Sequence, residues 1–495
     1  MSGRDRLSEA TLRGAKGATL PAYDRRRVTT GVVHLGVGAF HRAHQAVYID
    51  DCLAAGEAGW GIVGASLRST DTRDALAPQD GLYTLAEQDS SGEKLRVVGS
   101  IKELVVAPEN PEALVARMAA PTTRIVSLTV TEKAYLRDRG GDLDLAHPDI
   151  VHDLAEPQRP RTTHGFIAAA LERRRKEGAA PFTVLCCDNL PANGETLRRL
   201  ILQFAAARGG DLARYVEQEV AFPSTMVDRI VPATTDEDRE RISRAIGLAD
   251  AWPVKTEPFM QWVVEDRFTA GRPRWEKFGV TMVGDVRPFE EMKLRLLNGA
   301  HSGIAYLGLL CGRRSVSEAF SDPEIRGFVD RLWAEAIPTL PKGAGLDPQA
   351  YVTALARRFA NTALVHRTAQ IAMDGSQKLP QRILAAARGR LAEGRPAAHL
   401  MLVVAAWIAC CEARGTPAMP ESFTDPLDDR LAAVLVQRGS PEETVRRVFE
   451  AAGFGAVTGE AAGPLAGIAA RFLGTIRESG ARAAIEQAMR EEETE

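Results

Sequence analysis

The chain has 495 residues, of which 45% are hydrophobic and 26% are charged. This composition is typical of a globular protein and excludes a disordered or fibrous chain, and the length favours two large domains. The 62 basic and 65 acidic residues leave a net charge of -3, so no strong field would attract nucleic acid or an anionic membrane, and small-molecule chemistry is favoured.

We expect neither a secretion signal nor a membrane-spanning segment. The basic residues near the start are not followed by an apolar core, and the apolar stretch 400–411 is too short to cross a bilayer. The six cysteines include two adjacent pairs, which suit neither a disulfide framework nor a CxxC metal site. We therefore expect a cytoplasmic protein with reduced, buried cysteines, either a monomer or a small homo-oligomer.

Residues 1–285 alternate short apolar runs with segments of helical periodicity. The runs predict buried parallel strands, and the intervening segments predict the helices that connect them. The expected strands are 31–35, 61–67, 124–129 and 182–187, and the expected helices are 43–54, 110–118 and 195–207. This order predicts an α/β fold with a Rossmann-like, doubly wound domain over 1–285.

The strand pattern ends near Pro288. Pro288 and the two following acids, Glu290 and Glu291, suit the first turn of a long helix, and most of the remaining chain has helical spacing. We expect a mainly α-helical domain over 286–495. The pattern of the segment 256–285 is ambiguous, and one interpretation is a β-structured crossing between the domains.

The sequence VVHLGVGAFH at 32–41 runs from the first strand through a glycine turn into a helix. Such a turn can hold a pyrophosphate on backbone N–H groups, with Gly36 making the tight turn and Gly38 allowing the phosphate to approach. His41 stands where the third glycine of G-x-G-x-x-G normally lies, which weakens the match and predicts looser packing of the helix on the strand. We assign Gly36, Gly38, Phe40 and His41 to a dinucleotide site.

The imidazoles of His41 and His44 have the i, i+3 spacing of metal ligands, but no cysteine or carboxylate partner stands out in the sequence. A capping, phosphate-facing or surface role is favoured instead. We expect no metal.

The end of the second strand reads Ser66-Leu-Arg68-Ser, with Asp71 a little beyond. In an NAD enzyme an acid at this point accepts the ribose hydroxyls, and in an NADP enzyme an arginine meets the 2′-phosphate. Arg68 is therefore a candidate cofactor residue or a solvated side chain. The choice between NAD and NADP stays open.

Three polar residues interrupt the apolar helix that follows Pro288. At about 100° per residue, Lys293, Asn298 and His301 fall within an arc of roughly 140°, so all three can face one cleft. A lysine among apolar residues has a lowered pKa and can act as a base, while an amide and an imidazole can stabilise a developing alkoxide. The alternative is a surface lysine beside two structurally satisfied polar residues.

Further polar residues follow predicted strands, at the edge where open α/β sheets collect ligands. They are Thr131 to Lys133, Asp188-Asn189 and Asp228-Arg229.

These segments together resemble the mannitol dehydrogenase family over about 28–385. The matching motifs, in the family's order, are HLGVGAFHRAHQAVY, SLTVTEKAY, CDNLPANG, FPSTMVDRIVP, KLRLLNGAHS and QIAMDGSQKLPQR. The resemblance implies a Rossmann-like domain, a helical C-terminal domain, metal-independent hydride transfer with NAD (NADP as the alternative), and an active site between the domains. It implies that Lys293 is the general acid/base and that Asn298 and His301 polarise the reacting oxygen. It also implies that Asn189, Asp228 and Lys378 hold the substrate.

Within the family the motif sequences resemble those of fructuronate reductases (mannonate oxidoreductases) more than those of mannitol 2-dehydrogenases. Thr131-Glu-Lys-Ala-Tyr resembles the TEKGY of the former, and Gln370 and Met373 differ from the Arg and His of a mannitol enzyme. Lys133 suits a substrate carboxylate because it can give a charge-assisted hydrogen bond. Ala134 and Thr362 depart from the reductase pattern.

The sequence therefore predicts reversible hydride transfer between D-fructuronate and D-mannonate. The near alternative is the same chemistry on mannitol and fructose, or on arabinitol and xylulose. A non-catalytic nucleotide sensor would not need the polar trio on the Leu-rich helix, and a zinc alcohol dehydrogenase would need a Cys/His ligand set that the sequence does not show.

Overall fold

We describe the protein from a computed structural model. The structure describes residues 4–138, 140–343, 345–416, 419, 422–437 and 439–492. The chain divides between Arg287 and Pro288 into two compact units, called here the N-terminal and C-terminal units. The division lies two residues beyond the boundary expected from the sequence.

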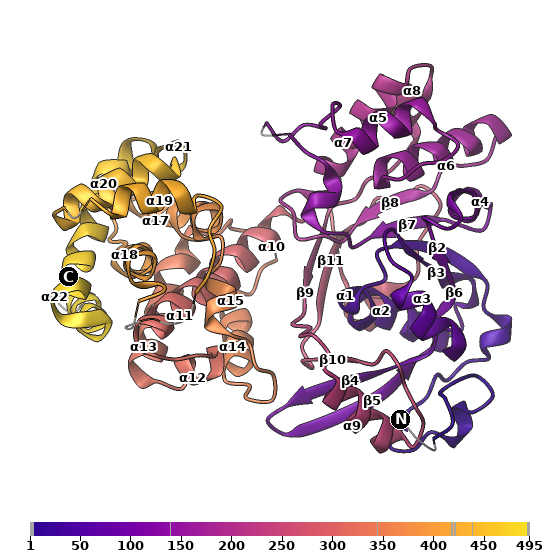
Figure 1. The fold of residues 1–495 in the computed structure, drawn as a ribbon, viewed down its shortest axis with the longest axis horizontal. Helices are drawn as coiled ribbons and strands as arrows, with labels where there is room; N and C mark the ends of the chain where they lie inside the picture. Colours follow the sequence, from indigo (N-terminus) through magenta and orange to yellow (C-terminus); the bar gives the residue numbers. More distant parts are fainter. Residues whose placement is uncertain are drawn as a thin grey trace. The chain divides into compact units, whose positions relative to one another are not determined.

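The core of the N-terminal unit is a five-stranded parallel sheet in the order β6-β3-β2-β7-β8 (Figure 1). Its strands are β2 (Thr30–Leu35), β3 (Gly61–Ser66), β6 (Ile101–Val106), β7 (Ile125–Leu128) and β8 (Thr183–Cys186). Four of these are the strands predicted from apolar runs, and the reversal of strand order at β2 is the doubly wound arrangement. The predicted Rossmann-like fold class is confirmed.

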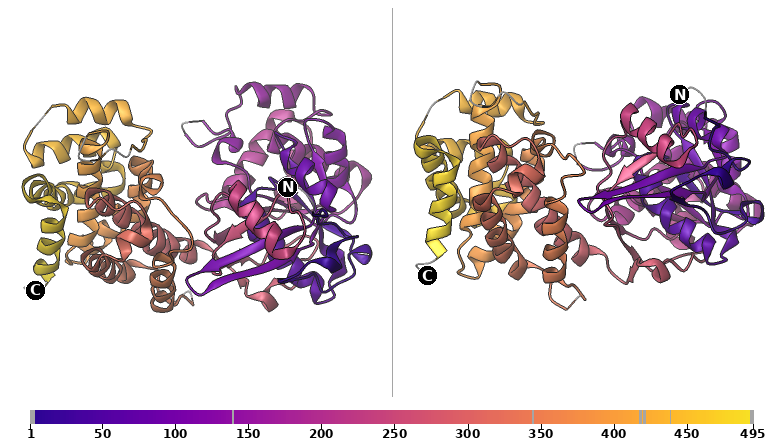
Figure 2. Two further views of the ribbon diagram at one scale, coloured as in Figure 1. Left: turned by 60° about the horizontal axis from the view of Figure 1, so that its bottom comes forward. Right: turned by 90° about the horizontal axis from the view of Figure 1, so that it is seen from below.

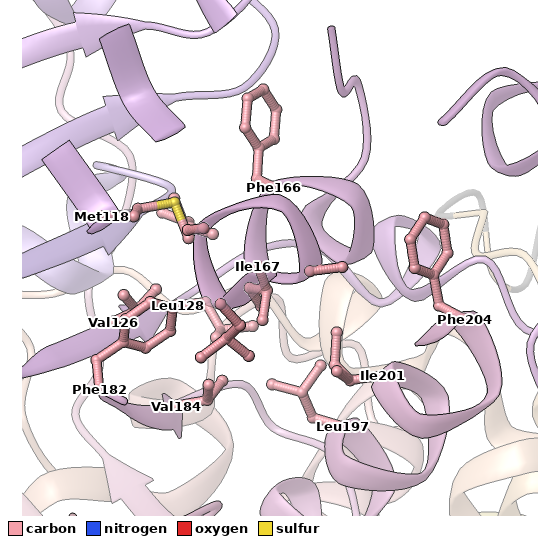
Figure 3. Close-up of a cluster of buried hydrophobic side chains, with 14 of the residues drawn as sticks. Met118, Val126, Leu128, Phe166, Ile167, Phe182, Val184, Leu197, Ile201 and Phe204 are labelled. Carbon is pink, nitrogen blue, oxygen red and sulfur yellow. The ribbon is translucent and has the colours of Figure 1, made fainter. Parts of the chain in front are cut away.

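Helices cover both faces of this sheet because alternate residues of each strand point to opposite faces. The helices of the unit are α1 (Ala39–Ala43), α2 (Gln45–Ala54), α3 (Asp71–Leu76), α4 (Pro111–Ala119), α5 (Pro148–Ala155), α6 (Thr163–Glu177), α7 (Asn193–Arg208), α8 (Leu212–Glu219) and α9 (Asp236–Ile246). Figure 3 shows one face, where Val126, Leu128 and Val184 lie in a buried cluster with side chains of α4, α6 and α7. On the other face Val32 and Ile125 pack with residues of α2.

Two smaller sheets complete the unit, and the sequence analysis anticipated β-structure only within 256–285. One has the order β1-β5-β4-β10 and contains the antiparallel hairpin of β4 and β5, and the other has the order β12-β11-β9. Their strands are β1 (Ala18–Thr19), β4 (Tyr83–Asp89), β5 (Gly92–Val98), β9 (Thr225–Asp228), β10 (Val254–Thr256), β11 (Gln261–Glu265) and β12 (Thr281–Val283). The ambiguous segment 256–285 therefore carries β-structure.

The C-terminal unit is built from helices, and Figure 2 shows them from two further directions. The helices are α10 (Arg287–Met292, whose first residue closes the N-terminal unit), α11 (Gly299–Leu310), α12 (Val316–Phe320), α13 (Pro323–Ala336), α14 (Pro348–Phe359), α15 (Thr368–Ala372), α16 (Gly375–Leu379), α17 (Ala385–Ala392), α18 (Ala398–Ala413), α19 (Asp428–Leu435), α20 (Pro441–Ala452), α21 (Gly455–Thr458) and α22 (Ala462–Glu492). Every residue of α18 from Ala398 to Cys411 is buried, and α18 packs against α11 and α22.

All six cysteines are free thiols, five of them buried and Cys311 half-buried. Within the described ranges no helix is both long and apolar enough to cross a membrane.

Candidate active site

The glycine turn joins β2 to α1. Gly36 has a φ of +93°, which favours glycine, and a Cβ added there would lie 2.1 Å from the carbonyl oxygen of Thr129 at the end of β7. Its N–H donates to the carbonyl of Ala65 on β3 (2.9 Å), so the turn is held between the two neighbouring strands. Gly38 is the N-cap of α1, and a Cβ added there would meet no atom within 4 Å. The open space over Gly38 and the first N–H groups of α1 fit a pyrophosphate.

His41 does not face that space, and the structure corrects its expected role. Its side chain is 1% exposed, and its ring stacks on His34 of β2 with centroids 3.4 Å apart. Burial holds the pKa of His41 well below its ordinary value, so the ring is neutral. The imidazole lies in the contact between helix and strand that the third glycine usually closes, so the expected surface role is wrong. Phe40 is half-buried, and its ring stacks on that of His44.

A directional chain of hydrogen bonds lies beneath the turn. His34 Nδ1 lies 2.8 Å from Ser127 Oγ, and His34 Nε2 lies 2.9 Å from Thr129 Oγ1. The Thr129 hydroxyl donates to the Gly36 carbonyl at 3.0 Å, so it must accept from His34 Nε2–H, and His34 Nδ1 must accept from the Ser127 hydroxyl. Burial lowers the pKa of His34 to about 3, which keeps this neutral tautomer in place. The network therefore fixes the carbonyl of the glycine turn.

Hydrogen bonds tie the carboxyl ends of β7 and β8 to the start of β9. Asp188, directly after β8, accepts hydrogen bonds from the Tyr135 hydroxyl (2.6 Å) and the Val130 N–H (3.1 Å). Burial raises the pKa of Asp188 to about 7. Asn193 Nδ2 donates to the carbonyls of Asp188 and Thr225, both at 2.9 Å, which links this edge to β9.

Three of the expected substrate residues lie in the N-terminal unit. Lys133 is exposed on the short helix Glu132–Tyr135, and Asn189 is exposed after β8. Asp228 ends β9 and is 4% exposed. Their common role at one substrate stays a prediction.

Arg68 lies at a different point of the same sheet. It lines a pocket of about 670 Å³ together with Leu67, Ala107 and Pro108, which follow β3 and β6, and with residues of α5 and the start of α6. In Rossmann-like sheets the adenosine of the cofactor binds beyond these strand ends.

The helix that carries Lys293 departs from the expected α-helical geometry. Residues Lys293–Asn298 form a π-helical segment between α10 and α11, in which the N–H of Gly299 donates to the carbonyl of Leu294, five residues back. One π turn separates Lys293 from Asn298, so their side chains lie on one face and are closer together than an α-helix would place them. Lys293, Asn298 and His301 are only 8%, 9% and 8% exposed. All three residues are therefore partly desolvated on consecutive turns of one helical stretch.

His301 is held as a neutral imidazole. Burial, with His366, Arg358 and Arg382 as basic neighbours, holds the pKa of His301 well below its ordinary value. Its Nε2 is buried and has no hydrogen-bond partner within the described part of the chain. A neutral ring with this nitrogen available can donate to a substrate oxygen.

A second π-helical segment, Pro380–Leu384, packs against the first. Arg382 Nη1 donates to Ser302 Oγ (3.2 Å) and to the carbonyl of Asn298 (3.4 Å). Lys378, on the helix just before this segment, donates to the Met373 carbonyl (2.7 Å) and lies 3.3 Å from Asp374. The packing places Lys378 on the helix that continues into the segment beneath Asn298.

The sequence reasoning missed the residues that support the site: His34 with Ser127 and Thr129, Tyr135 with Asn193, and Arg382. A polar residue within an apolar strand, such as His34 in GVVHL, was the signal that could have found the first group. Among the described residues no group of three or more His, Cys, Asp or Glu side chains is arranged to hold a metal ion.

Comparison with known proteins agrees with this geometry. The mannitol dehydrogenase Rossmann domain matches residues 30–277, and the mannitol dehydrogenase C-terminal domain matches residues 285–461. The D-mannonate oxidoreductase of Escherichia coli is 46% identical over 395 residues, which cover 78% of this chain and 81% of that protein. A mannitol 2-dehydrogenase of Cereibacter sphaeroides is 45% identical over 400 residues, 80% of this chain and 84% of the relative.

Among solved structures, the Pseudomonas fluorescens mannitol 2-dehydrogenase in ternary complex with NAD and D-mannitol has a TM-score of 0.84. It is 37% identical to this chain, and the match covers 98% of this chain and 99% of that one. The family matches span both units. The open space over Gly38 in the glycine turn fits the pyrophosphate of NAD, the cofactor bound in that relative. The chain therefore belongs to the mannitol dehydrogenase family, and it is an NAD-dependent dehydrogenase.

Proposed function

We propose that the protein interconverts D-fructuronate and D-mannonate, with NAD(H) as the hydride carrier. The observation that carries the chemistry is the position of Lys293, which is 8% exposed and one π turn from Asn298. The sugar-acid substrate is supported by Lys133 at the carboxyl edge of the sheet and by the similarity to the D-mannonate oxidoreductase.

Each residue of the trio has a distinct task. In the reducing direction Lys293 Nζ gives a proton to the carbonyl oxygen of the substrate, and in the oxidising direction it takes that proton back. The Asn298 amide and the His301 Nε2–H donate hydrogen bonds to the same oxygen and stabilise its negative charge in the transition state. Because His301 is neutral, it adds no positive charge that would compete with Lys293 for the proton.

Mannitol and fructose are the second candidate pair. The relative from Cereibacter sphaeroides is a mannitol 2-dehydrogenase of nearly the same identity as the mannonate enzyme, 45% against 46%. We expect NADH oxidation by the wild type to be most efficient with fructuronate in a panel that also contains tagaturonate, fructose and xylulose. A higher kcat/KM with fructose than with fructuronate would favour mannitol and fructose as the substrate pair.

The role of Lys133 can be tested with the same panel. Replacement of Lys133 by Gly or Gln removes a charge-assisted hydrogen bond to the substrate carboxylate, and we expect kcat/KM for fructuronate to fall by roughly 10- to 100-fold. The value for fructose should stay nearly unchanged because fructose has no carboxylate. Arg137→Gln, which removes an exposed charge four residues further on, is the control. Equal losses on both sugars would contradict the carboxylate role.

The hydrogen-bond network beneath the glycine turn should affect cofactor binding. His34→Leu removes the donor to Thr129, frees the Gly36 carbonyl to move, and should weaken NADH binding roughly tenfold while kcat at saturating NADH is preserved. NADH fluorescence gives the dissociation constant, and His34→Gln, which retains a donor and an acceptor, should recover part of the affinity. A lower melting temperature with unchanged NADH affinity would show that His34 supports only the fold.

A further inference from the structure

Three arginines come together around the pocket at the ends of β3 and β6. Arg68 follows β3, and Arg159 and Arg161 lie in the segment between α5 and α6, yet all three line the same space of about 670 Å³. All three side chains are exposed. The fold thus gathers positive charge from two distant segments of the chain at the place where the adenosine of a Rossmann-bound cofactor lies.

None of these guanidinium groups is neutralised by the protein. Within the residues that the structure describes, Arg68, Arg159 and Arg161 make neither an ion pair nor a side-chain hydrogen bond. Two acids also line the pocket, and each has a basic neighbour: Asp149 lies 3.9 Å from His147, and Glu156 lies 3.7 Å from His152. With three arginines against two carboxylates, the charged side chains of the lining sum to +1 with histidine neutral.

The end of β3 lacks the acid that would select NAD over NADP. The strand ends at Ser66, and Leu67-Arg-Ser-Thr follows before Asp71 begins α3. An acid at this position accepts hydrogen bonds from the ribose hydroxyls and repels a 2′-phosphate, whereas an arginine stabilises the phosphate. This stretch has an arginine and two hydroxyls and no carboxylate.

We propose that the pocket is also a binding site for the 2′-phosphate of an adenine nucleotide, so that the protein binds NADP(H) as well as NAD(H). Arg68 makes the principal contact, and Arg159 and Arg161 add charge from the segment between α5 and α6. The inference rests on the cofactor site of the proposed function. It goes beyond that function in assigning a second cofactor and two further arginines.

The full-length protein can be titrated with 2′,5′-ADP and with ADP in a calorimeter, which needs neither sugar nor turnover. We expect 2′,5′-ADP to bind at least as tightly as ADP. Arg68→Gln should weaken 2′,5′-ADP roughly tenfold or more while ADP changes little, because the variant loses a charge-assisted hydrogen bond that only the 2′-phosphate makes. Arg159→Gln and Arg161→Gln should have smaller effects of the same kind. All three side chains are exposed, so the variants should fold normally.

Arg214→Gln is the matched control. Arg214 is also exposed and lies in the same unit, but it pairs with Asp211 at 2.8 Å and does not line the pocket. It should leave both affinities unchanged. The affinity for 2′,5′-ADP should also fall more steeply with salt than that for ADP, because screening weakens contacts between exposed charges.

NADH and NADPH fluorescence titrations separate this inference from the proposed function. Binding of both nucleotides, with only NADPH weakened by Arg68→Gln, would support the phosphate site. Binding of NADH alone, or an equal loss of both nucleotides in Arg68→Gln, would overturn the phosphate site and leave the proposed function intact. Failure of both nucleotides to bind would overturn both proposals.

Discussion

Lys293→Met should lower kcat for the reduction of fructuronate by roughly 10²- to 10⁴-fold, the usual contribution of a positioned general acid/base. The substituted side chain keeps an apolar stem of similar length, so the buried site should stay packed and the free energy of unfolding should change little. The dissociation constant for NADH should be unchanged because Lys293 is not part of the glycine turn that we assign to the pyrophosphate. Stopped-flow turnover and NADH fluorescence measure the two quantities.

The matched control is Lys342→Met, which removes an exposed ammonium group from the same unit. Its kcat should equal that of the wild type. A second variant, Lys293→Ala, leaves space in which a small primary amine can replace the missing proton-transfer group, so methylamine should restore part of the rate. Full turnover by the Lys293→Met protein would contradict the role of Lys293 as general acid/base and would overturn the mechanism.

The main sheet could be predicted because its strands are buried on both faces. Val32, Val33 and Leu35 place apolar side chains on both faces of β2, and such apolar runs between helical segments indicate a parallel sheet. The hairpin of β4 and β5 could not be recognised in the same way. Its strands include the half-buried Glu87-Gln-Asp89 and the exposed Gly92-Glu-Lys94, which break the apolar pattern.

The composition of the polar trio could be read from the sequence, but its geometry could not. Over six residues the periods of an α-helix and a π-helix give nearly the same pattern, so Lys293 and Asn298 were expected further apart than they are. The second π-helical segment has a local cause, because Pro380 has no N–H and crowds the preceding turn. The first has none: Lys293–Asn298 contains neither Pro nor Gly. Because π-helical segments are rare and concentrate at functional sites, this unexplained segment supports Lys293 as a functional residue.

His41 shows where motif reasoning misleads. The glycine pattern treats the sixth position only as a missing glycine, and it does not reveal that a buried imidazole can fill the same space. The partner that makes this possible, His34, is seven residues earlier in the strand, and only the fold brings the two rings into a stack.

The two glycines of the turn should respond to the same substitution in opposite ways. In Gly36→Ala the new Cβ would lie 2.1 Å from the Thr129 carbonyl oxygen, and a φ of +93° is strained for any residue with a side chain. Since Thr129 follows β7 directly and Gly36 is bonded to β3, neither side can move without disturbing the central strands. We expect the free energy of unfolding to fall by about 3 kcal/mol or more, together with loss of NADH binding. Chemical denaturation and NADH fluorescence measure both effects.

Gly38→Ala is the matched substitution two residues away. Its Cβ would meet no protein atom within 4 Å, and its φ of -79° suits any residue, so stability should stay within about 0.5 kcal/mol of the wild type. The same methyl group would stand in the open space through which the pyrophosphate approaches the helix N-terminus, so NADH affinity should fall at least tenfold. A stable Gly38→Ala protein that binds NADH as tightly as the wild type would contradict the placement of the pyrophosphate over this turn. A Gly36→Ala protein of normal stability would contradict the contact with Thr129. Only the combination of a destabilised first variant and a stable, weakly binding second variant agrees with a turn that is fixed on one side by the sheet and open on the other to the cofactor.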